Sequence, residues 1–342
     1  MPTFDSTDKV AEQETMRKSR YTRSKEPSVL VMTTGRTRIL EALNRYQFLR
    51  TSHIHGLIEN TCFNRTQRQL RALWDAKLID RPKEQLWAYN GLFNEEIYTL
   101  DKRGIEYLQE QDKNSETATN LYRGKGTTYR KYFSHSMMIC DTLASIEMGS
   151  LGTDVRYIPM SEILAGTDDP KPLQLTCTVT HDFGGRVETS KSKHLVPDGI
   201  FGLEYSNGKK AYFVLEAENT STIHPSTLKR SSSFLKKLIG YRDIVKTQVY
   251  KEKLGVGNMR VIVVAPTDTR SNNQRKLVED LVGKSHLFLF ASVPTHSVNA
   301  KGMLRSPKPC PELFTAEWHR AGLPTERIDG STLKDRTDHK AS

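Results

Sequence analysis

The stretch HLVPDGIFGLEYSNGKKAYFVLEAENTS, residues 194–221, predicts two apolar strands joined by a tight turn. The turn is Ser206-Asn207-Gly208, and Asn-Gly readily adopts the positive φ that a two-residue hairpin requires. In an antiparallel hairpin, Asp198, early on the first strand, approaches Glu216, late on the second. Glu218 follows two residues later and therefore projects from the same face as Glu216. The sequence thus predicts that three carboxylates converge at one end of this hairpin.

These carboxylates indicate a metal site. Like charges at short distance repel, so we expect a hard divalent cation to neutralise Asp198, Glu216 and Glu218. Oxygen ligands of this kind suit Mg²⁺ or Mn²⁺, which we take as the expected cofactor. A structural role stays open as the alternative, because buried acidic pairs also occur in scaffolds without activity.

The segments around the hairpin predict an α/β domain over residues 127–295. His135 lies within the first of its helices, and we interpret it as a core or interface residue rather than a catalytic one. The polar stretch 161–193 suggests an insertion or an extended hairpin. The other elements expected in this domain are helices over 127–149, 225–252 and 273–281 and strands over 259–266 and 286–293.

Residues 34–115 predict a second, smaller unit of three helices followed by a strand, a polar wing over 81–94 and a returning strand. Its closing stretch YTLDKRGIEYL, residues 98–108, resembles the end of winged-helix regulators. A third helix that exposes Arg and Gln can enter the major groove of DNA, where Arg pairs with guanine and Gln with adenine. A winged helix used for protein contacts is the alternative. The residues expected to bind DNA are Arg65, Gln67, Arg68, Gln69 and Arg71.

The overall charge favours a polyanionic partner. The chain of 342 residues has 51 Lys and Arg against 40 Asp and Glu, a formal charge of +11. Neutralising phosphates releases counterions, so nucleic acid is the first candidate, although an acidic membrane surface has the same attraction. No apolar run is long enough to span a bilayer, no export leader is visible and the four cysteines are scattered. We therefore expect a soluble cytoplasmic protein with DNA and not a membrane as partner.

The two ends of the chain lack a periodic apolar face. Residues 1–33 are predicted to be a flexible basic tail, because they cannot bury enough surface to offset the entropy of ordering. Residues 296–342 are predicted to be a loosely packed or disordered C-terminal tail for the same reason.

Pro197-Asp198 followed by Glu216-Ala217-Glu218 resembles the PD-(D/E)xK nuclease motif on its usual hairpin. One departure is that Glu218 occupies the position of the lysine of that motif. Members of this fold can place the lysine on the following helix, which here offers Lys229, Arg230, Lys236 and Lys237. Lys237 and Tyr241 are an i, i+4 pair and therefore share one helix face. The resemblance implies a restriction-endonuclease-like mixed sheet flanked by helices.

A winged helix, an ExE hairpin and a KxxxY helix over residues 34–293 together resemble the replication-relaxation proteins of plasmids and the MobC-type mobilisation relaxases. The resemblance implies a metal-dependent nick at a plasmid origin of transfer or replication, with other relaxosome proteins as further partners. It leaves the nucleophile open between water and Tyr241. The alternatives are a DNA-binding accessory protein or regulator without activity, and a defence or restriction nuclease that cuts both strands. The implied catalytic residues are Asp198, Glu216, Glu218, Lys237 and Tyr241.

Overall fold

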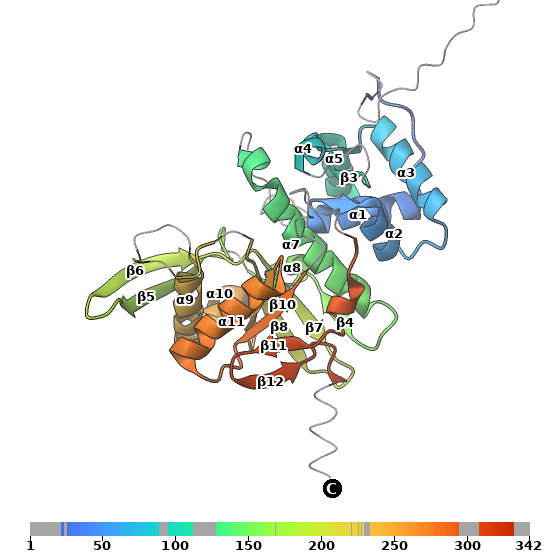
Figure 1. Ribbon diagram of the computed structural model, residues 1–342. Coiled ribbons are helices and arrows are strands. Elements are labelled where there is room, and N and C mark those ends of the chain that lie inside the picture. Colours follow the sequence, from blue (N-terminus) through green and yellow to red (C-terminus); the bar gives the residue numbers. More distant parts are fainter. Residues whose placement is uncertain are drawn as a thin grey trace, which may run out of the picture.

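The protein is a mixed α/β chain in which one long helix, α7 (Thr128–Ser150), lies between a small N-terminal unit and a large sheet (Figure 1). In the part of the chain that the structure describes, no helix is long and apolar enough to cross a membrane. This computed structural model describes residues 22–23, 26–88, 95–111, 128–167, 169–219, 221–224, 226, 228, 233–293 and 308–331.

The N-terminal unit packs its helices around a three-stranded antiparallel sheet of order β1-β3-β2. The amphipathic third helix buries Leu70, Leu73 and Trp74 as its apolar spacing predicted, which leaves its polar face outside. The elements are α1 (Thr34–Tyr46), β1 (Leu49–Arg50), α2 (Thr51–Leu57), α3 (Phe63–Asp75), β2 (Ile79–Asp80), β3 (Ile97–Leu100) and α5 (Lys102–Gln111).

The stretch predicted as a polar wing differs in part from that expectation. A short helix, α4 (Glu84–Ala88), lies within it, and residues 89–94 are outside the described residues. Gln85 is buried, and its side-chain amide bonds both the N–H and the carbonyl of Ile97 on β3. This side chain satisfies buried backbone groups beside the strand, so the start of the stretch is fixed rather than free.

The large sheet has seven strands in the order β12-β11-β10-β9-β8-β7-β4. The predicted hairpin is confirmed as β7 and β8, which pair antiparallel from Gly199 opposite Leu215 to Glu204 opposite Lys210. Gly208 in its turn has a φ of 74°. Strands β8, β9 and β10 run parallel. The bounds are β4 (Arg156–Ile158), β7 (Gly199–Glu204), β8 (Lys210–Ala217), β9 (Arg260–Ala265), β10 (Phe288–Ser292), β11 (Trp318–Arg320) and β12 (Leu323–Glu326).

Helices cover both faces of this sheet, and side-chain alternation along β8 shows which residues face which helix. Phe213 and Leu215 belong to the apolar cluster that contains α7 and the N-terminal unit, whereas Val214 belongs to the cluster around α9. Glu216 is in phase with Val214 and therefore faces α9. The helices on that side are α9 (Phe234–Thr247), α10 (Val249–Leu254) and α11 (Asp268–Val282).

The helix expected over 225–252 begins later and is divided in two. Ser233 caps α9 by accepting a hydrogen bond from the Lys236 N–H, and Gln248 with a φ of 58° separates α9 from α10. Lys229 and Arg230 lie outside the described residues. The polar stretch before the main hairpin forms α8 (Met160–Leu164) and a two-stranded sheet of β5 (Leu175–Asp182) and β6 (Val187–Leu195), which extends away beside α9 (Figure 1).

The C-terminal tail predicted for 296–342 is corrected for residues 308–331. Strand β11 pairs with β10, and the fully buried Trp318 donates its indole N–H to the Leu313 carbonyl at 3.1 Å. Strands β11 and β12 are only three and four residues long, so a few large apolar side chains anchor the segment without any periodic pattern.

The tail predicted for residues 1–33 is corrected where it is described. Arg23 places its guanidinium 2.9 Å from Asp101 and 3.5 Å from Asp80, and the Ser28 N–H donates to the Asp75 carbonyl at 3.1 Å. These contacts hold the chain before α1 against the N-terminal unit, and Arg23 therefore has a structural role there.

Candidate functional site

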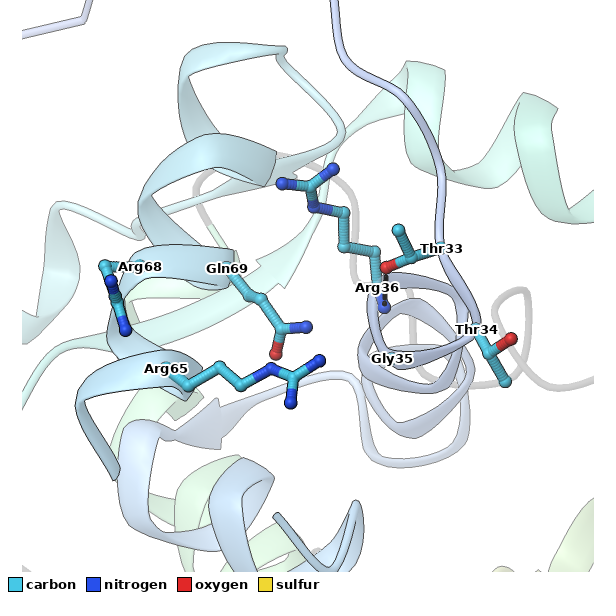
Figure 2. A pocket seen from close by; sticks show the side chains of 7 residues that line it. All are labelled: Thr33, Thr34, Gly35, Arg36, Arg65, Arg68 and Gln69. Atoms are coloured by element: carbon cyan, nitrogen blue, oxygen red, sulfur yellow. Dashed lines mark hydrogen bonds between the residues drawn. The ribbon is translucent and has the colours of Figure 1, made fainter. Parts of the chain in front are cut away.

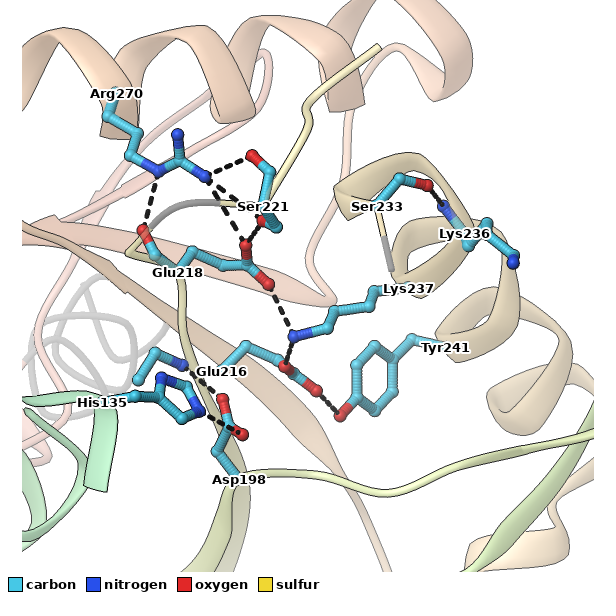
Figure 3. Close-up of polar contacts among 11 residues, drawn as sticks. His135, Asp198, Glu216, Glu218, Ser221, Ser233, Lys236, Lys237, Tyr241 and Arg270 are labelled. Carbon is cyan, nitrogen blue, oxygen red and sulfur yellow. Dashed lines mark hydrogen bonds and ion pairs between the residues drawn. The ribbon is translucent and has the colours of Figure 1, made fainter. Parts of the chain in front are cut away.

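The hairpin brings Asp198 and Glu216 together as predicted. The Asp198 N–H donates to the Leu215 carbonyl at 3.0 Å, and the Ala217 N–H donates to Asp198 Oδ2 at 2.8 Å. These two bonds fix Asp198 across the strand pair from Glu216, and Figure 3 shows the two carboxylates side by side. The convergence of acidic groups therefore arises from backbone pairing between β7 and β8.

Lys237 on α9 lies between the two glutamates. Its Nζ donates to Glu216 Oε2 and, at 2.6 Å, to Glu218 Oε1 (Figure 3). Both glutamate residues are only 1% exposed, so each carboxylate needs a cationic partner inside the protein. The lysine thus comes from the helix after the hairpin, and Glu218 shares the face of Glu216.

Tyr241 lies one helical turn after Lys237 and contacts the same cluster. Its hydroxyl donates to Glu216 Oε1, and the residue is fully buried. Burial, followed by the charge of Glu216, raises the pKa of Tyr241 well above its usual value of 10. The phenol therefore stays protonated and orients Glu216.

Two further residues reach the acidic cluster that local sequence patterns did not indicate. His135 on α7, interpreted from sequence as a core or interface residue, has its Nε2 3.1 Å from Asp198 Oδ1. Arg270 on α11 donates from Nε to the Glu218 carbonyl at 2.7 Å and places a terminal nitrogen 3.8 Å from Glu218 Oε2. Both come from helices distant in sequence, so only the tertiary fold brings them here.

A family model described as replication-relaxation matches residues 40–259, which is more than half of the chain. The chain belongs to the replication-relaxation family. The match includes most of the N-terminal unit, the hairpin with Asp198, Glu216 and Glu218, and all of α9. No curated protein and no solved structure gives a significant match. Membership suggests a role of this replication-relaxation protein in plasmid replication or mobilisation.

The two neighbouring carboxylates of this replication-relaxation protein have pKa values that are shifted apart. Burial raises the pKa of Glu216 to about 7, against an opposing effect of Lys237. Burial also disfavours the charged form of Asp198, but the hydrogen bond with His135 and the charge of Lys237 lower its pKa below the ordinary 3.8. Burial opposes the charge of His135, while the bond with Asp198 raises the pKa of the imidazole. Asp198 is therefore ionised at neutral pH, where Glu216 gains or loses its proton.

The charge of Lys237 is fixed by its surroundings. Burial favours the neutral amine, but Glu216, Asp198 and Glu218 together raise the pKa of Lys237 above its usual value. Lys237 and Arg270 thus offset charge on the three carboxylates, and His135 contacts Asp198. These side chains therefore offset charge that the sequence analysis assigned to a divalent cation, and the expected Mg²⁺ or Mn²⁺ stays a prediction.

The acidic cluster of Asp198, Glu216 and Glu218 fits a metal ion only in part. Among the described residues, no three His, Cys, Asp or Glu side chains are arranged as ligands of one ion. Glu218 does not fit as a ligand, because Lys237, Ser221 and Arg270 all bond or face its carboxylate. Asp198 and Glu216 fit better, since each carboxylate oxygen keeps a second lone pair and Mg²⁺ is often held by one or two carboxylates with water.

The residues expected to bind DNA lie on α3, in the N-terminal unit. Arg65, Gln67, Arg68 and Arg71 are exposed and Gln69 is half-buried, so the helix presents a polar, basic outer face. Arg71 differs from the other two arginines because its Nε donates to Asp75 at 3.0 Å. The structure therefore brings the acidic residues together in one cluster and places the basic set on a separate unit.

Proposed function

We propose that this protein is a DNA-nicking protein of the relaxase type that uses Mg²⁺ or Mn²⁺ and acts at a plasmid origin of transfer or replication. The observation that carries the proposal is the buried cluster of Asp198, Glu216 and Lys237, in which neighbouring carboxylates have separated pKa values. Such clusters of perturbed groups are typical of catalytic sites. Family membership supports the plasmid setting.

The architecture supports the same function. The N-terminal unit has the element order α1-β1-α2-α3-β2-α4-β3-α5, and its three strands and the helices before β2 favour a winged helix with α3 as the recognition helix. The larger sheet carries its acidic residues on an antiparallel hairpin and its lysine on the next helix, as the PD-(D/E)xK resemblance implies. DNA bound by the exposed residues Arg65, Gln67, Arg68, Gln69 and Arg71 would then be cut by the sheet domain.

The roles of the site residues follow from their contacts. Asp198 and Glu216 would hold the metal, which when bound polarises the scissile phosphate and stabilises its developing charge. Lys237 supplies a permanent positive charge within reach of the same carboxylates, and Glu218 anchors its ammonium group. His135 holds Asp198 in place, and Tyr241 holds Glu216.

Water is the nucleophile that this arrangement favours. A tyrosine nucleophile must reach the phosphorus atom and lose its proton, whereas the Tyr241 hydroxyl is buried and donates to Glu216. The nick would then be a hydrolysis that leaves no protein attached to the DNA.

The test uses supercoiled plasmids that carry fragments of the replicon encoding the protein. Wild type with Mg²⁺ or Mn²⁺ should convert one of them to the open circle, and EDTA should prevent this. Glu216→Ala should lose the activity, while Glu252→Ala, an exposed glutamate on α10, should keep it. Equal nicking by wild type and Glu216→Ala, or none by either, would contradict the enzymatic proposal.

The nucleophile is tested on the same reaction in denaturing gels. Wild type should give no protein–DNA adduct, and Tyr241→Phe should still nick, more slowly. An adduct in wild type that disappears in Tyr241→Phe would instead assign the attack to Tyr241.

A DNA-binding accessory protein or regulator without activity is the second candidate. This candidate is favoured by the ion pairs of Lys237 with Glu216 and Glu218, because they allow both glutamates to stay buried without a metal. DNA binding without nicking in the plasmid assay would support it. A linear product instead of an open circle would indicate a nuclease that cuts both strands.

A further inference from the structure

An open hollow of about 590 Å³ lies between the start of α1 and the outer face of α3. Residues 33–36 form one wall, and Arg65, Arg68 and Gln69 form the other (Figure 2). The Arg65 guanidinium and the Gln69 amide extend from α3 toward α1 in this view. The walls approach closely, since a Cβ at Gly35 would lie 2.8 Å from Gln69 Nε2.

The hollow carries uncompensated positive charge. Among the described residues, neither Arg65 nor Arg68 pairs with an acidic side chain, and neither α1 nor α3 has an acidic residue in its first turn. Arg36 donates from Nη1 to the Val31 carbonyl, while its second terminal nitrogen has no hydrogen bond to the described residues. That nitrogen and the Arg65 guanidinium can therefore donate to an anion in the hollow.

The first turn of α1 adds to this attraction. Thr33 Oγ1 accepts from the Arg36 N–H at 3.4 Å, whereas the amides of Thr34 and Gly35 have no helical carbonyl to bind, as at every helix start. The partial positive charge of a helix N-terminus favours a phosphate group. The planar guanidinium groups of the arginines present several N–H donors in a fixed geometry, and they give the hollow its main affinity for such an oxyanion.

We propose that this hollow binds one backbone phosphate of duplex DNA and thereby sets the position of α3 along the groove. Arg36 and Arg65 hold the phosphate from opposite walls, and Arg68 contributes charge at the rim. Phosphate contacts of this kind fix the register of a protein on the duplex without reading sequence. The inference rests on the proposed function, because it takes DNA as the ligand of the N-terminal unit.

The experiment measures the affinity of the full chain for a random-sequence duplex of about 30 base pairs between about 50 and 200 mM salt. A random sequence is suitable because a phosphate contact does not depend on the bases. The hollow is removed by the double variant Arg36→Gln/Arg65→Gln. The matched control Lys246→Gln/Lys251→Gln removes the same charge from exposed positions on α9 and α10.

The logarithm of the binding constant should fall linearly with the logarithm of salt concentration. In the hollow variant the slope should be smaller by about 0.9, the value for one phosphate, and affinity near 100 mM salt should fall roughly tenfold. The control should keep the wild-type slope. Arg65 is exposed, whereas Arg36 is half-buried and bonds the Val31 carbonyl, so the thermal midpoint of the hollow variant should fall only slightly below that of wild type.

Each other outcome overturns a defined part of the proposal. Wild-type binding with an unchanged slope in the hollow variant would reject the phosphate site but leave DNA recognition by the N-terminal unit intact. Absence of duplex binding by wild type would reject the proposed DNA recognition itself. If wild type did not bind duplex DNA, inorganic phosphate would be added at matched ionic strength. A rise in the thermal midpoint of wild type but not of the hollow variant would then identify the hollow as a site for free phosphate.

Discussion

Two charged regions of the molecule differ in how their charges are balanced. One is the acidic cluster on β8 and α9, and the other is the basic hollow between α1 and α3. Glu216 and Glu218 are buried, and Lys237 compensates both within the protein. Arg65 and Arg68 are exposed, with no acidic partner among the described residues. A buried charge must be balanced by the fold itself, whereas an exposed one can be left for a ligand. The comparison shows that the charges of the acidic cluster are paired within the fold, whereas the arginines of the basic hollow are left accessible to a ligand.

The largest expected effect comes from removing the cation of the acidic cluster. Lys237→Met should lower the free energy of unfolding by about 3 to 5 kcal/mol, because it leaves buried carboxylates without their counter-charge. Urea denaturation measures this loss. Arg65→Gln in the hollow should change stability by no more than about 0.5 kcal/mol, as expected for a surface residue. Equal losses of unfolding free energy in the two variants would contradict the claim that, of these two regions, only the acidic cluster is needed for stability.

A second substitution tests the cause of that loss. Adding Glu216→Gln to Lys237→Met removes one of the stranded charges and should recover part of the stability. A double variant less stable than Lys237→Met would show that packing, rather than charge, dominates at this position.

The second effect is a dependence of stability on pH to which Glu216 of the acidic cluster contributes. The pKa of Glu216 is about 7 in the folded protein against 4.5 ordinarily, so the folded state holds this proton more tightly than the unfolded chain. Its stabilising contribution is fully present below about pH 4.5 and is lost as pH rises to about 7, by up to about 3 kcal/mol.

The measurement compares wild type with Glu216→Gln by urea denaturation in EDTA from about pH 5 to pH 8. The difference isolates Glu216 from the other titrating groups. Wild type should lose stability relative to Glu216→Gln over this range. A difference that does not change with pH would mean that Glu216 keeps its ordinary pKa.

The third effect is smaller and concerns the orientation of Glu216. Tyr241→Phe removes one buried hydrogen bond and keeps the ring, so it should cost about 1 to 2 kcal/mol of stability. Phe234→Leu, at a buried position on the same helix without a hydrogen-bonding group, provides a packing control. If Tyr241→Phe left both stability and nicking unchanged, the tyrosine would have no role in positioning Glu216.

The smallest effect separates the arginines of α3 from one another. Arg71 already pairs with Asp75 on the surface, so Arg71→Gln should cost at most about 0.5 kcal/mol of stability. It should also weaken binding to random-sequence DNA less than Arg65→Gln does, because part of its charge is compensated. Equal weakening by both substitutions, measured by fluorescence anisotropy, would show that DNA displaces the Asp75 contact.

Much of the site was predictable because it depends on local periodicity. The Asn207-Gly208 turn fixes the register of β7 and β8 and hence the meeting of Asp198 and Glu216. The four-residue spacing of Lys237 and Tyr241 places both against Glu216. His135 was not predicted as part of the site, since α7 meets Asp198 only through tertiary packing across 63 positions of sequence. Sequence alone could not show that cationic side chains converge on the same carboxylates, and the expected Mg²⁺ or Mn²⁺ stays a prediction.

The ends of the fold were less predictable for a related reason. Residues 308–331 have no repeating apolar pattern, yet Trp318 is fully buried and extends the sheet through β11. Similarly, Gln85 turns part of a polar loop into a fixed element through two bonds to Ile97. Single large or polar side chains determine whether these segments adopt a fixed structure, and methods based on periodicity do not detect such side chains.

The pairing of β11 with β10 has a practical consequence for anyone who shortens or tags this protein. A chain cut before residue 318 would leave the apolar strand FLFAS, Phe288–Ser292, as an open edge with unpaired amides and carbonyls. Open apolar edges of this kind recruit strands from other molecules. During synthesis on the ribosome, the same edge stays unpaired until residues 318–320 of β11 have left the exit tunnel.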